Sequence, residues 1–111
     1  MAHPSLVPSL NEDLHFILCD FGRAGLACVE TDPADADATT VVQNLLHGQY
    51  ERPLRVLALN VDEGWSRDVS EAIAAKVRDV AEHEGRELTS GTLAFIEDHI
   101  GRALQPTLPL W

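Results

Sequence analysis

The 111-residue sequence predicts an α+β domain with a small three-stranded mixed sheet and three helices, in β-β-α-β-α-α order. Three short apolar runs rich in strand-forming residues are bounded by turn residues, and three other stretches repeat apolar residues at helical spacing. A chain of this length fits one domain. The strands are expected at about residues 14–20, 26–31 and 54–61, and the helices at about 33–46, 68–84 and 90–104.

The domain is expected to occupy residues 13–104. Residues 1–12 contain two prolines and small side chains, which predicts a flexible N-terminal arm. Residues 105–111 are expected to form an extended C-terminal tail, because Pro106 and Pro109 cannot continue a helix.

The first two strands are predicted to form an antiparallel hairpin around a glycine-containing turn. A turn centred between Arg23 and Ala24 sets Cys19 opposite Cys28. One face of the hairpin is then expected to carry Ile17, Cys19, Phe21, Leu26 and Cys28. The other is expected to carry Leu14, Phe16, Leu18, Ala27 and Val29.

Both hairpin faces are apolar, so both need a cover. Either the three helices enclose the sheet, or they cover one face and leave the other to a second subunit, for which a homodimer is the simplest arrangement. We assign the face with Ile17, Cys19, Phe21, Leu26 and Cys28 as the candidate oligomer face. The opposed cysteines also permit a redox pair, but two reduced, buried hydrophobes are the favoured interpretation.

The helix boundaries follow from capping residues. Asp32 followed by Pro33 is a typical start of the first helix. The second helix is predicted to begin near residues 66–68, where Asp68 and Glu71 fit a capping box, and to end at Gly85. The third helix is predicted to bury Leu93, Ile96, Ile100 and Leu104 on one face.

Composition excludes several partners. The chain has 18 acidic and 8 basic residues and a formal net charge of −10, which argues against binding to a nucleic-acid backbone. No apolar run reaches the roughly 18 residues of a membrane span. The N-terminal sequence lacks the basic and apolar regions of a signal peptide, so a cytoplasmic location is expected.

Motifs for catalysis are missing. The five histidines are scattered without metal-ligand spacing, and no cysteine pair has zinc-site spacing, so no metal site is predicted. The sequence has neither a nucleophile elbow nor a phosphate-binding glycine loop, so no cofactor and no catalytic residue are assigned.

The most suggestive segment for binding lies between the third strand and the second helix. Trp65 and Arg67 belong to the residue types enriched in binding hot spots, and Asp62 stands beside them. Tyr50, which precedes the same strand, completes the candidate binding residues. The competing interpretation packs Trp65 over the helix start and pairs Arg67 with an acid.

Four strings carry a resemblance: residues 16–22 (FILCDFG), 29–33 (VETDP), 48–50 (GQY) and 63–70 (EGWSRDVS). The chain resembles a family of small uncharacterised alphaproteobacterial proteins over residues 14 to about 100. The resemblance implies a cytoplasmic bacterial protein, and it implies no activity and no functional residues.

Three functions remain open. The first is a non-catalytic cytoplasmic protein-interaction module, either a homo-oligomer or an adaptor that binds another protein. The second is a small-molecule-binding protein or small enzyme with a pocket near Trp65 and Arg67. The third is an acidic mimic of nucleic acid that occupies a basic protein, which requires acids in two rows at phosphate-like spacing.

Overall fold

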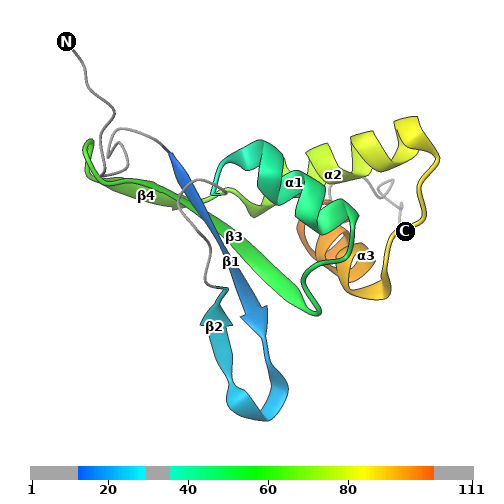
Figure 1. Ribbon diagram of the computed structural model, residues 1–111, viewed down its shortest axis with the longest axis horizontal. Helices are drawn as coiled ribbons and strands as arrows, with labels where there is room; N and C mark the ends of the chain where they lie inside the picture. The colour runs from blue at the N-terminus through cyan, green and yellow to red at the C-terminus, as the bar shows by residue number, and fades with distance from the viewer. Residues whose placement is uncertain (1–12, 30–35, 102–111) are drawn as a thin grey trace, which may run out of the picture.

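The computed structural model describes residues 13–29 and 36–101, and within them the sheet has four strands (Figure 1). The α+β composition with three helices is as predicted, but the three-stranded mixed sheet was wrong. All neighbouring strands are antiparallel, in the order β2-β1-β3-β4. The strands are β1 (Leu14–Asp20), β2 (Leu26–Cys28), β3 (Pro53–Asn60) and β4 (Trp65–Asp68).

Strand β4 was not predicted from the sequence. The second helix was expected to start in its place. Ser66 and Asp68 pair with Leu59 and Leu57 of β3. Residues 66–68 are polar, as an exposed edge strand requires, and this same polarity resembles a helix cap. Helix α2 (Ser70–Glu84) begins only after the strand.

The hairpin has a different register from the predicted one. Leu18 pairs with Cys28 and Cys19 with Ala27, so Cys19 and Cys28 are not opposite each other. The turn, which contains a 3₁₀ segment over Gly22–Ala24, is centred on Arg23 and not between Arg23 and Ala24 as predicted. A shift of one residue moves every side chain of a strand to the other face.

Helix α1 (Ala38–Leu46) starts later than predicted. Asp37 is its N-cap, and its side chain accepts a hydrogen bond from the Thr40 amide at 3.0 Å. The predicted cap at Asp32 and Pro33 lies outside the described residues, as do the predicted arm (1–12) and tail (105–111).

Helix α2 ends at Gly85, whose φ of 65° is the left-handed conformation of a C-cap. Helix α3 (Ser90–Ile96) is capped by Thr89 and continues as a π-helical turn, Glu97–Gly101. Of its predicted buried face, Ile96 and Ile100 are buried and Leu93 is half exposed. Leu104 lies outside the described residues.

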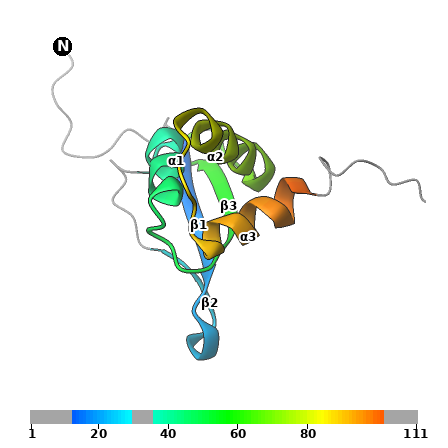
Figure 2. The same ribbon diagram turned by 90° about the vertical axis from the view of Figure 1, so that its right-hand side faces the viewer.

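The three helices gather on one side of the sheet (Figures 1 and 2). Alternate residues of β1 and β3 point toward them: Ile17 and Val56 form a cross-strand pair and are fully buried. The helices contribute the remainder of the core, chiefly Val41, Leu45, Ile73, Ala74, Val77, Phe95 and Ile96.

Two buried hydroxyls join the layers. The Ser70 Oγ at the start of α2 accepts a hydrogen bond from the Val56 amide at 2.8 Å. The Thr92 hydroxyl donates to the Leu45 carbonyl oxygen at 2.9 Å, which ties α3 to the end of α1. Buried polar groups need such partners, so these bonds fix the positions of the helices over the sheet.

Candidate functional site

The face of the sheet opposite the helices is apolar and is the main candidate for a functional surface. The register sets Leu14 beside Leu59 and Phe16 beside Leu57, with Leu18 next in the row. These five side chains are only partly buried. None of them belongs to the core formed with the helices. We call them the open sheet face.

Polar groups border the open sheet face on β3 and β4. The Arg55 guanidinium and the Asp68 carboxylate form an ion pair at 2.7 Å. The Asp68 carboxylate also accepts a hydrogen bond from the Ser70 amide at 2.8 Å. The two charges at this border therefore neutralise each other beside the apolar row.

The surroundings of Asp68 shift its titration. Burial raises the pKa of this carboxyl group. Hydrogen bonds from Ser70, together with the hydrogen bond and positive charge of Arg55, lower the pKa by more than burial raises it, so the net pKa lies below the ordinary value. The ionised form is thus favoured in the folded protein.

Because the folded-state pKa of Asp68 is lowered, its ionisation stabilises the fold above the unfolded pKa of about 3.9, and this stabilisation is lost as pH falls through the folded pKa. We expect Asp68→Asn to lower the free energy of unfolding by about 1 kcal/mol at pH 7, since the pair is partly exposed. The difference from wild type should vanish on acidification below the folded pKa. Urea titrations at several pH values measure this difference. The variant Arg55→Gln shows how much of the change in the free energy of unfolding comes from the ion pair. A difference that stays constant into acid contradicts the expectation.

The predicted oligomer-face residues do not share one environment. Ile17 and Cys19 are buried beneath the helices, whereas Phe21, Leu26 and Cys28 are exposed on the hairpin. The hairpin projects away from the helices in both views (Figures 1 and 2). Of the two faces distinguished in the sequence, the row with Leu14, Phe16 and Leu18 is the one that the helices leave open.

Both cysteines are free thiols. Burial, and secondarily the neighbouring Cys28, raises the pKa of the Cys19 thiol above its ordinary value. Cys19 is therefore held as a neutral thiol, which agrees with its interpretation as a small core hydrophobe. The same interpretation was wrong for Cys28, which is exposed.

Trp65 and Arg67 lie together on β4. The Arg67 guanidinium stacks over the Trp65 ring at 4.8 Å from its centroid, and the indole Nε1 donates to the Glu63 carboxylate at 2.7 Å. Asp62 is exposed on the preceding turn. Tyr50 lies at the other end of β3 from this turn. The eight residues of β3, at about 3.3 Å each, make the strand about 26 Å long.

Tyr50 is buried, and its hydroxyl accepts a hydrogen bond from the Asn44 amide at 3.2 Å. Burial raises the pKa of Tyr50 above its ordinary value. The structure thus joins Trp65 to Arg67 and leaves Tyr50 in the core. Among the described residues, no cluster of three or more metal-binding side chains occurs.

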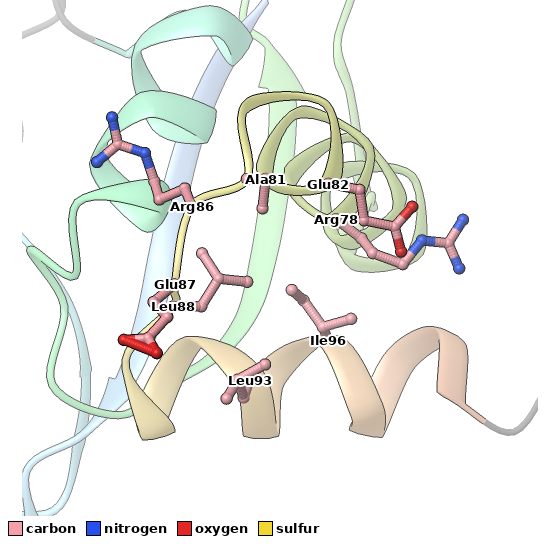
Figure 3. A pocket seen from close by; sticks show the side chains of 9 residues that line it. Arg78, Ala81, Glu82, Arg86, Glu87, Leu88, Leu93 and Ile96 are labelled. Atoms are coloured by element: carbon pink, nitrogen blue, oxygen red, sulfur yellow. The ribbon is translucent and has the colours of Figure 1, made fainter.

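A groove of about 680 Å³ lies between the C-terminal half of α2, the loop after it and α3 (Figure 3). Leu88 and Ile96 point into the space between the two helices, and the guanidinium groups of Arg78 and Arg86 lie at its two sides. This groove was not predicted from the sequence. Leu88, an apolar residue in a loop after Gly85, was the available signal.

No family model, curated protein or solved structure matches this chain. The resemblance to the alphaproteobacterial family therefore stays a prediction. Within the described part of the chain, no helix is both long enough and apolar enough to cross a bilayer.

Proposed function

We propose that this chain is a protein-interaction module that forms a homodimer by packing two open sheet faces together. The observation that carries the proposal is the apolar row on β1 and β3, of which Phe16 and Leu57 are the central cross-strand pair. Partly exposed large apolar side chains in one contiguous row are typical of an interaction surface. Two such faces pack about 10 Å apart, as in sheet-on-sheet packing.

The charge distribution makes the open sheet face the surface through which a second copy of this chain can approach. The whole chain carries a formal net charge of −10, so two copies repel each other over most of their surfaces. At the border of the open sheet face, Arg55 and Asp68 neutralise each other. At this border, two chains can therefore approach without opposing uncompensated charges.

The dimensions of the sheet suit a dimer. The strands β1 to β4 have 7, 3, 8 and 4 residues, and at about 3.3 Å per residue and 4.8 Å between strands they give a face of roughly 350 Å² in projection. Each partner of a standard interface contributes about 800 Å² of accessible surface, which is the same order. A two-fold axis through the face makes the interface self-complementary.

We also propose that the dimer forms in the cytoplasm. The exposed Cys28 and the buried Cys19 are free thiols, and the observed register does not pair them. A reducing compartment keeps such thiols free.

Light scattering coupled to size exclusion, over a dilution series, tests the dimer. Wild-type protein is expected to elute as a dimer that dissociates on dilution. Leu57→Lys brings like charges together near the two-fold axis and is expected to raise the dimer Kd at least tenfold, about 1.4 kcal/mol. Circular dichroism verifies that the variant is folded.

The matched control is Leu93→Lys, which adds the same charge at a half-exposed leucine on the helical side of the molecule. It is expected to leave the dimer Kd unchanged. A wild-type chain that is monomeric at every concentration, or equal weakening by both variants, overturns the proposal.

A further inference from the structure

We propose that residues 102–111, which follow α3, dock into the groove between α2 and α3 of the same chain. The groove exposes apolar surface, since Leu93 is 49% exposed at its edge. An occupant must therefore bring apolar side chains.

The sequence of residues 102–111 supplies apolar side chains. It reads RALQPTLPLW, so it has leucines at 104, 108 and 110 and a tryptophan at 111. Its two prolines favour extended backbone. Arg102 is its one charged side chain, so the leucines and the tryptophan can be buried without burying a charged side chain of the segment.

The groove lies within reach of this segment. The helical region of α3 ends at Gly101. At a rise of about 1.5 Å per residue, Ile96 and Leu93 lie about 8–12 Å back along the helix. About four extended residues cover that distance at ~3.3 Å each, which leaves Leu108, Leu110 and Trp111 to lie in the groove.

The covalent connection favours docking within one chain. A short tether holds a segment near its site at an effective concentration on the order of millimolar. Neither a second copy nor another protein reaches that concentration under ordinary conditions. The groove is also on the helical side of the sheet, so its occupation does not compete with a dimer formed through the open sheet face (Figures 1 and 3).

Tryptophan fluorescence of the full-length chain tests the docking. The sequence has two tryptophans, so Trp65→Phe leaves Trp111 as the single reporter. In that background we expect blue-shifted emission and protection from acrylamide quenching. Adding Leu93→Lys in the groove should shift the emission to longer wavelength and remove the protection. Leu93 is half exposed, so the added lysine should leave the circular dichroism spectrum unchanged.

The control is Leu26→Lys in the same background, which adds a lysine at an exposed leucine on the projecting hairpin. It should leave the emission and the quenching of Trp111 unchanged. Emission like that of free tryptophan in water, unmoved by Leu93→Lys, overturns the proposal. Protection that disappears on dilution assigns the groove to a second copy and equally overturns docking within the chain.

Discussion

Replacing Phe95 by alanine is expected to lower the free energy of unfolding by about 3–5 kcal/mol, the usual cost of removing a buried phenylalanine ring. Phe95 is 1% exposed and belongs to the core where α3 meets the sheet. Its ring contacts that of His99, with centroids 4.8 Å apart. His99 in turn lies 2.6 Å from the Leu54 carbonyl oxygen through its Nε2. The substitution therefore leaves a cavity and loosens the contact of α3 with β3.

Urea unfolding monitored by circular dichroism measures this loss. Phe21→Ala is the matched control, because it removes the same ring from a side chain that is 48% exposed on the hairpin. It should change the free energy of unfolding by no more than about 0.5 kcal/mol. Equal effects of the two variants contradict the placement of Phe95 at the centre of the core.

Gly91→Ala is expected to destabilise the fold by about 3 kcal/mol, at the upper end for overpacked sites. In a helix, alanine normally stabilises relative to glycine by up to about 1 kcal/mol. At Gly91 the sign reverses, because an added Cβ collides with the Glu51 carbonyl oxygen. That oxygen is part of the backbone leading into β3, so relief requires α3 to move away from the sheet.

Gly101→Ala is the control for this prediction. A Cβ at Gly101 meets only the Glu97 side chain at an ordinary distance of 3.5 Å. This variant should be neutral or slightly stabilised in a thermal melt, whereas Gly91→Ala should melt at a lower temperature. A stabilised Gly91→Ala variant contradicts the close approach of α3 to the segment before β3.

The elements predicted correctly from sequence are those with strong local signals. The apolar run of β3 and the helical spacing of Val41 and Leu45 identify their elements without any partner. Strand β4 was missed because its polar residues become a strand only through hydrogen bonds to β3. The hairpin register was missed because the connection, with its 3₁₀ segment, is centred on Arg23, which shifts the pairing by one residue from that of a turn centred between Arg23 and Ala24.

The candidate surfaces were predicted only in part. Alternation along β1 correctly separates Phe16 from Ile17, but it cannot tell which of two apolar faces the helices cover. Trp65 and Arg67 do lie in contact, as their spacing on a strand permits. The groove was invisible in sequence because it depends on the relative positions of α2 and α3, which tertiary contacts such as that of Thr92 with Leu45 determine.

The central position of β1 has a consequence for synthesis in the cell. β1 is made before its long partner β3, and Leu14 has no neighbour there until Leu59 has been translated. At 5–20 residues per second, this delay lasts about 2–9 s. During it, only the three residues of β2 are available to pair with β1. The nascent chain thus carries an unpaired apolar strand that chaperones can bind, and the sheet closes only after β3 emerges.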